Sequence, residues 1–185
     1  MSDMKKALVP LADGFEDIEA VAVIDILRRG GVHVVTAALA PEPYALSAHG
    51  IGMQTDAVLD DVLADHWDAL ILPGGGQGTA NLLACEPLLD RLRAQKESGG
   101  YICAICAAPT VLAAAEVIED EDVTCYPSCA PEMGRPVVDA PAVADGQIIT
   151  GRGPGAAITF ALAVLMHLAG EETAHDVAEG MVTVI

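Results

Sequence analysis

Basic residues are scarce in this sequence. Lys and Arg number nine among 185 residues, against 27 Asp and Glu, which gives a formal net charge of −18. Because proteins bind phosphate backbones through clustered Lys and Arg, this composition excludes nucleic acid as an expected partner. Aromatic residues make up only 3% of the chain, so the core must be built from aliphatic side chains. The acidic excess is also typical of adaptation to high salt, which we take as a hypothesis.

Long hydrophobic runs are missing too. The longest apolar stretches, such as residues 158–165, are much shorter than the roughly 20 residues of a membrane-spanning helix. The first six residues lead into a strand-length run at 7–11 without the apolar segment and cleavage site of a signal peptide. We therefore expect a soluble, cytoplasmic protein that is not bound to a membrane.

The five cysteines are an odd set, so a complete disulfide framework is not expected. Cys103 and Cys106 form a C-x-x-C, but Cys103 falls inside a predicted strand and not at a helix start, as a thioredoxin-like site requires. A zinc site that adds Cys125 and Cys129 stays open as an alternative, although two of its four positions fall in predicted strands. Otherwise Cys103, Cys125 and Cys129 are packing residues or secondary oxidation sites, and we expect no metal.

Strand-like and helical patterns alternate along the chain. The predicted strands cover residues 7–11, 32–39, 69–72, 101–105, 123–125 and 147–150, with a hairpin-like excursion at 44–55. The predicted helices cover residues 18–29, 86–98, 109–116, 155–169 and 171–180. This alternation predicts an α/β fold, one domain over residues 1–185, with a mostly parallel sheet covered on both faces.

Ligands of parallel sheets bind beyond the carboxyl ends of the strands. Three segments follow predicted strands directly, residues 13–19, 73–78 and 106–109. The candidate site is therefore expected where these segments meet.

Cys106 falls in the tight turn between the strand at 101–105 and a helix that begins at Pro109. A nucleophile elbow has this arrangement, in which a strained turn lifts the side chain clear of the sheet. The helix N-terminus is expected to favour the thiolate and lower its pKa. A buried, inert cysteine is the alternative.

Glycines at 74–76 match neither a Walker motif nor G-x-G-x-x-G. If this loop faces Cys106, the N–H groups of Gly75 and Ala107 can hold a developing oxyanion; a simple turn is the alternative. Glu19 follows Ile18 at a helix start, where it either turns inward with a raised pKa or stays on the surface. No histidine directly follows Cys106 as a base.

Together these segments resemble the ThiJ/PfpI superfamily, in particular its YajL-like branch, which includes the Parkinson disease protein deglycase. The motifs that carry the resemblance are residues 12–19 (ADGFEDIE), 72–75 (LPGG), 104–110 (AICAAPT) and 152–155 (RGPG). The match runs through nearly the whole chain, with the four motifs in the family's order and spacing.

The resemblance implies a flavodoxin-like three-layer sandwich that forms a homodimer. It implies Cys106 as nucleophile, Glu19 as a protonated acid, and the amides of Gly75 and Ala107 as oxyanion donors, with Gly74 lining the site. The activities it implies need no cofactor: conversion of small dicarbonyls such as methylglyoxal to lactate, repair of glycated groups, and protection against oxidative stress. A redox sensor or redox-regulated chaperone that uses oxidation of Cys106 is the alternative.

The chain departs from the family at three positions. Proteases of the superfamily carry His where Ala107 stands, which disfavours peptide hydrolysis. Tyr126 takes the place of a histidine near the site in the human deglycase. His49 replaces an arginine of the hairpin region, whereas Arg29 keeps its counterpart, so anion binding is expected to be weaker or to depend on pH through His49.

Overall fold

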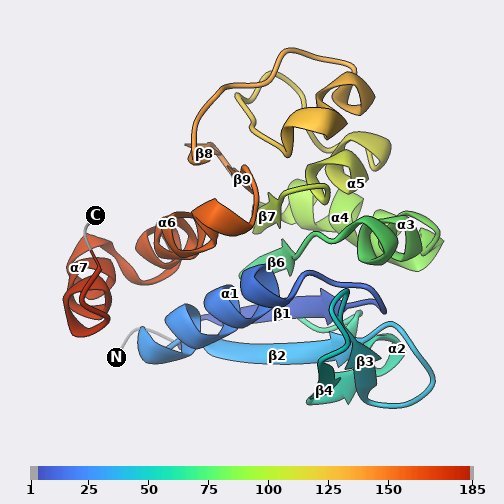
Figure 1. Ribbon diagram of the computed structural model, residues 1–185, viewed down its shortest axis with the longest axis horizontal. Helices are drawn as coiled ribbons and strands as arrows, with labels where there is room; N and C mark the ends of the chain where they lie inside the picture. The colour runs from blue at the N-terminus through green and yellow to red at the C-terminus, as the bar shows by residue number, and fades with distance from the viewer. Residues whose placement is uncertain (1–3, 184–185) are drawn as a thin grey trace.

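The computed structural model describes residues 4–183 and has three layers, a central sheet with helices on both faces (Figure 1). The strands are β1 (Lys6–Leu11), β2 (His33–Ala38), β3 (Tyr44–Leu46), β4 (Gly52–Gln54), β5 (Ala57–Val58), β6 (Ala69–Leu72), β7 (Tyr101–Ile105), β8 (Ala142–Asp145) and β9 (Ile148–Gly151). The α-helices are α1 (Asp17–Arg29), α2 (Leu59–Val62), α3 (Gly76–Leu83), α4 (Glu86–Ser98), α5 (Pro109–Ala114), α6 (Ala157–Ala169) and α7 (Glu171–Gly180). Two 3₁₀ helices are η1 (Pro127–Met133) and η2 (Pro154–Ala156).

The central sheet has the strand order β5-β2-β1-β6-β7-β9-β8. All neighbours pair in parallel except β8, which runs antiparallel to β9 at the edge. β3 and β4 form a separate antiparallel hairpin. The expected flavodoxin-like class with a mostly parallel sheet is confirmed.

The central strands are apolar along their whole length because helices cover both of their faces. In β6, Ala69 and Ile71 face the layer of α1, α6 and α7, whereas Leu70 and Leu72 face the layer of α2 to α5. All four side chains are fully buried, and β7 divides its side chains between the two layers in the same way. The continuous apolar runs of the sequence thus correspond to strands buried between two helical layers.

β1, β6 and β7 are neighbours in the sheet, so their carboxyl ends lie side by side. The segments that follow them are residues 12–16, 73–75 and 106–108. A backbone hydrogen bond from Glu16 N–H to the Gly74 carbonyl, at 2.9 Å, joins the first two. The predicted convergence of three segments is confirmed.

Some predicted elements are wrong or incomplete. Residues 123–125 form no strand; Thr124 N–H donates to the hydroxyl of Thr150 at 2.9 Å instead of to a strand backbone. β8, whose half-exposed residues give no strong pattern, was not predicted. α3 was missed because it begins with Gly76 and Gly78, which are poor helix formers.

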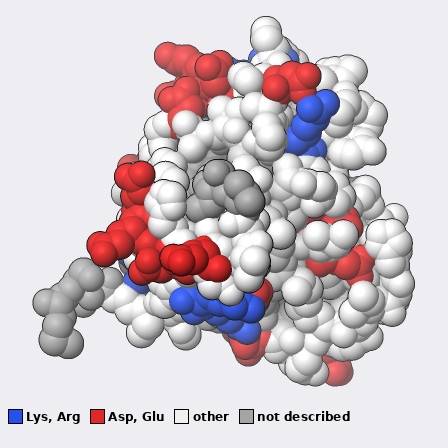
Figure 2. All heavy atoms as spheres, turned by 60° about the vertical axis from the view of Figure 1, so that its left-hand side comes forward, with Lys and Arg blue, Asp and Glu red and all other residues white. Residues whose placement is uncertain are grey.

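Within the described range 4–183, none of the helices combines the length and apolar composition needed to cross a bilayer. Acidic side chains cover more of the face drawn in Figure 2 than basic ones do.

Added salt should stabilise this protein. With a net charge of −18, the folded chain repels itself, and screening shortens the range of that repulsion from about 10 Å at 0.1 M salt to about 3 Å at 1 M. We expect the melting temperature to rise by several degrees between 0.1 and 2 M KCl, as followed by circular dichroism. Equal melting temperatures at both concentrations would contradict salt adaptation.

Candidate active site

Cys106 lies at a strained turn between β7 and α5. Its φ of +67° is in the left-handed region that L-residues avoid, and its side chain is almost fully buried. Its N–H donates to the Gly151 carbonyl at 2.9 Å, and its carbonyl accepts from Tyr126 N–H at 2.8 Å. Both backbone groups of Cys106 are thus hydrogen-bonded to neighbouring segments, and the expected elbow geometry is present.

Glu19 is in the first turn of α1 and points inward, with a relative exposure of 1%. The carboxyl of Glu16 caps the helix by accepting from Glu19 N–H at 2.8 Å. Glu19 Oε2 accepts from Gly74 N–H at 2.8 Å, and the carboxyl group also hydrogen-bonds the thiol of Cys106. The structure therefore favours the inward orientation over the surface alternative.

The glycine loop closes around this pair. Gly75 has a φ of +95°, and a Cβ there would lie 2.2 Å from the Gly14 carbonyl oxygen, so only glycine fits. The N–H groups of Gly75 and Ala107 both hydrogen-bond the sulfur of Cys106. The structure thus brings two backbone donors, one acid and one thiol together.

Gly74 packs against both Cys106 and Glu19, and replacing it should disturb both residues. A Cβ at this position would lie 2.7 Å from Cys106 Cβ and 2.7 Å from Glu19 Oε2. We expect Gly74→Ala to lower the free energy of unfolding by about 1–3 kcal/mol, measured by urea denaturation. Gly76→Ala is the matched control, because a Cβ there meets nothing within 4 Å. Equal stability of the two variants would contradict this packing.

The titration of Cys106 differs from the sequence prediction, whereas that of Glu19 agrees with the inward alternative. Burial raises the pKa of Glu19 to about 7, against the hydrogen bonds from Cys106 and Gly74. Burial, the charge of Glu19 and its hydrogen bond raise the pKa of Cys106 to about 12, although the N–H groups of Gly75 and Ala107 act in the opposite direction. The expected lowering of the thiol pKa by the helix N-terminus is therefore wrong, because burial and the adjacent carboxylate outweigh the amides.

The raised pKa of Glu19 predicts an unusual pH dependence of stability. Below pH 4.5 the carboxyl is protonated in both states, and its stabilising contribution is fully present. Between pH 4.5 and about 7 it ionises only in the unfolded chain, so about 3 kcal/mol is lost as the pH rises. We expect the stability difference between wild type and Glu19→Gln to change by that amount from pH 4 to pH 8 in urea titrations. A pH-independent difference would contradict the buried, protonated state.

Tyr126 and His49 flank the pair. Tyr126 lies beside the elbow through its backbone bond to Cys106, and the residue is 45% exposed. His49 is on the β3–β4 connection, where Ala48 N–H donates to the Phe15 carbonyl and fixes the hairpin beside the start of α1. The hydrogen bond and charge of Asp17 raise the pKa of His49 above that of a free imidazole.

Arg29 does not line the site within this chain, and that prediction is corrected. It is at the far end of α1, ten residues or about 15 Å along the helix axis from Glu19. Its guanidinium pairs with Asp25, and it lines a separate surface cavity with Thr173 and Asp176. The helix geometry, which places residues 19 and 29 at opposite ends, explains the discrepancy.

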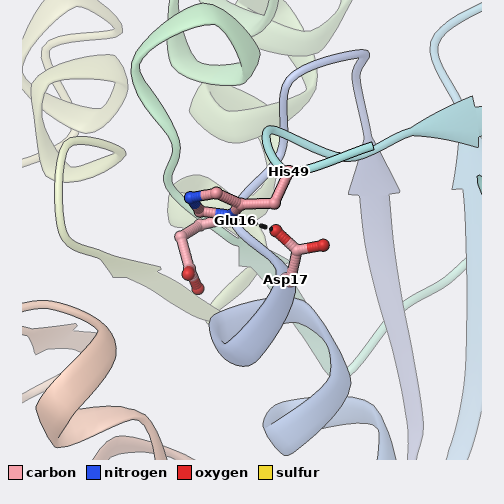
Figure 3. Close-up of side chains that lie close together, drawn as sticks. All are labelled: Glu16, Asp17 and His49. Atoms are coloured by element: carbon pink, nitrogen blue, oxygen red, sulfur yellow. Dashed lines mark hydrogen bonds and ion pairs between the residues drawn. The ribbon is translucent and has the colours of Figure 1, made fainter. Parts of the chain in front are cut away.

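Glu16, Asp17 and His49 are the only group of three or more metal-ligating side chains found close together among residues 4–183. His49 Nδ1 bonds Asp17 Oδ2 at 2.7 Å, while the carboxyl of Glu16 points away from this contact toward its capping position (Figure 3). The four cysteines of the zinc alternative do not gather within the described residues, so that alternative is wrong.

The sequence interpretation missed two supporting residues. Glu16 enters the sequence interpretation only as part of the 12–19 motif, yet it caps the helix by accepting from Glu19 N–H, and its charge adds to the raised pKa of Glu19. Gly151 was given no role, yet it accepts from the N–H of the nucleophile. The acidic residues Glu16 and Asp17 at a helix start were the available signal for the cap. The role of Gly151 could be found only from the pairing of β7 with β9.

Comparisons with known proteins find relatives along nearly the whole chain. The model of the DJ-1/PfpI family matches residues 5–167. Protein dj-1beta of Drosophila melanogaster is 40% identical over 180 residues, covering 96% of both chains. The glutathione-independent glyoxalase DJR-1.2 of Caenorhabditis elegans is 38% identical over 176 residues, covering 93% of both chains. The crystal structure of Drosophila melanogaster DJ-1beta superposes with a TM-score of 0.95 at 39% identity, covering 98% of this chain and 100% of that chain.

Proposed function

The chain belongs to the DJ-1/PfpI family, and from this premise we propose that it is a cysteine-dependent glyoxalase that acts on small reactive dicarbonyls such as methylglyoxal. The observation that carries the proposal is the contact between the Cys106 thiol and the Glu19 carboxyl, with two backbone N–H donors directed at the sulfur. A nucleophile, a base and an oxyanion site are the parts that attack on a carbonyl needs.

The first step is a proton transfer from Cys106 to Glu19. With a pKa of about 7, a substantial fraction of Glu19 is ionised at neutral pH, and it is in contact with a thiol that holds its own proton. The Glu19 carboxylate takes that proton as Cys106 Sγ bonds to the aldehyde carbon. The N–H groups of Gly75 and Ala107 stabilise the negative oxygen, which then receives the proton from Glu19 to give a hemithioacetal.

Glu19 performs the second proton transfer as well. Its carboxylate removes the hydrogen from the former aldehyde carbon while the hydroxyl proton on that carbon passes to the ketone oxygen, which gives an enediolate. Glu19 then returns its proton to the adjacent carbon. The product is a lactoyl thioester of Cys106, which is an isomer of the hemithioacetal. Water hydrolyses this thioester to lactate and restores the thiol. One carbon is oxidised and its neighbour reduced, so methylglyoxal and water balance lactic acid without an external oxidant.

Lactate formation from methylglyoxal by the purified protein, without glutathione, tests this function. The proposal expects turnover that exceeds the amount of enzyme many times. Lactate yields no higher than in an enzyme-free control would contradict it.

We also propose that residues 1–185 act as one domain, as a homodimer, in the cytoplasm. Ile18 and Val21 on α1 and Ile51 on the neighbouring hairpin are 57%, 50% and 59% exposed, which gives a second copy an apolar surface to cover. All five thiols are free, which suits a reducing compartment. Light scattering after size exclusion tests the dimer; a mass near 19.0 kDa would contradict it.

A further inference from the structure

A cavity of about 550 Å³ lies beside the elbow, and the proposed reaction does not use it. Its size is within the range of roughly 300–1,000 Å³ typical of pockets for drug-sized ligands, and methylglyoxal is far too small to fill it. We call it the Tyr126 cavity. The residues that define it are Tyr126, Pro127, Pro141, Arg152, Pro154 and Ala156.

The cavity is fixed to the nucleophile by backbone hydrogen bonds on two sides. Tyr126 N–H donates to the Cys106 carbonyl at 2.8 Å, and Cys106 N–H donates to the carbonyl of Gly151, the residue before Arg152, at 2.9 Å. One wall segment of the cavity therefore begins at Tyr126, which bonds Cys106 directly. The other begins at Arg152, the residue after the one that bonds Cys106. The walls of the cavity are therefore anchored to the backbone of Cys106 through both its N–H and its carbonyl.

The walls select an aromatic group. The ring of Tyr126 packs over Gly153, where a Cβ would lie 3.2 Å from the ring, so the glycine leaves room for it. Three prolines and an alanine supply the other apolar walls. An aromatic substituent can stack against a tyrosine ring in such an environment, whereas a methyl group gains little.

The charge of the cavity is unusual for this chain. No Asp or Glu lines it, although acidic residues outnumber basic ones threefold in the sequence, and its one charged wall residue is Arg152. Arg152 Nη1 pairs with Asp139, a partner that is 80% exposed. A guanidinium facing mostly apolar walls suits a ligand that is apolar with an oxygen acceptor at one end.

We infer that the Tyr126 cavity binds the substituent of the substrate, so that this chain prefers α-oxoaldehydes bearing an aromatic ring to methylglyoxal. This inference rests on the proposed glyoxalase function and specifies its substrate class. The reaction balances as before: phenylglyoxal and water give mandelate through the same Cys106 thioester.

The test compares kcat/KM for phenylglyoxal, from mandelate formation, with kcat/KM for methylglyoxal, from lactate formation, using initial rates. We expect the phenylglyoxal value to be the larger in the wild type. Tyr126→Ala should lower the ratio of the two values about tenfold, and Tyr126→Phe, which keeps the ring, should restore most of it. Tyr44→Ala is the matched control, because Tyr44 is similarly exposed at 48% but lies on β3, outside the cavity, and should leave the ratio unchanged.

The outcomes separate the two proposals. Turnover of methylglyoxal with a ratio that Tyr126→Ala leaves unchanged overturns the inference and leaves the glyoxalase function standing. That result is also expected if a second copy of the chain, and not substrate, fills the cavity. Turnover of neither compound overturns both.

Discussion

Cys106→Ser is expected to reduce kcat/KM for methylglyoxal by about 10³-fold or more. The hydroxyl of serine is a much weaker nucleophile than a thiol and holds its proton far more tightly. Serine is nearly isosteric with cysteine and, as an L-residue, is subject to the same backbone strain, so the fold should persist. The measurement is lactate formation under substrate-limited conditions, with circular dichroism to verify the fold.

Cys129→Ser is the control for this variant. Cys129 is a partly buried thiol on η1 that makes no contact with Glu19 in the structure, and its loss should leave the rate within about twofold. Retention of full activity in Cys106→Ser would contradict the nucleophile assignment. A wild type that forms no lactate but consumes one equivalent of peroxide at Cys106 would instead support the redox sensor alternative.

Glu19→Gln is expected to lower kcat/KM by about 10²–10⁴-fold, because the amide cannot carry either proton transfer. The pH profile gives a second readout. The wild-type rate should rise as the pH increases through about 7, where the carboxyl loses its proton and becomes the base, and the variant should lack that rise. Gln keeps an oxygen acceptor for Gly74 N–H, so the loss of activity should not follow from unfolding.

Glu97→Gln is the matched control for the acid. Glu97 is exposed on α4, on the helical layer opposite α1, and its replacement should alter neither the rate nor the pH profile. A wild-type rate that is flat between pH 6 and 8, or a Glu19→Gln variant that keeps its rise through pH 7, would contradict the role of Glu19 as the base.

The sequence predicted the position of the site better than its electrostatics. Cys106 and the glycine loop were identified because strands, turns and glycines leave local signatures, and neighbouring parallel strands bring the segments after them together. The inward orientation of Glu19 could not be predicted from periodicity, since position 19 in a helix start suits a surface acid equally well. The pKa of Cys106 was predicted in the wrong direction because burial is a property of the assembled layers and leaves no mark in the turn itself.

Long-range geometry accounts for the other differences. Arg29 was placed near the site from resemblance alone, whereas the length of α1 separates it from Glu19 within the chain. β8 is an edge strand whose side chains are half exposed, so its pattern did not stand out. The Tyr126 cavity was not predicted, because its walls come from segments around residues 126, 141 and 153 that only the fold brings together.

The backbone of Cys106 has a φ of +67°, so the residue that the proposed catalysis needs is in a conformation that lowers the stability of the fold. A left-handed conformation costs an L-residue roughly 1–2 kcal/mol, which glycine avoids. Glycine loses about 0.5–1 kcal/mol through its more flexible unfolded chain, and it also gives up the packing of a buried side chain, so relief of the strain offsets only part of the cost of losing the thiol. A directed-evolution screen for heat resistance alone would therefore exert little pressure to keep a residue that is strained in this conformation, and any selection for robustness must be coupled to turnover.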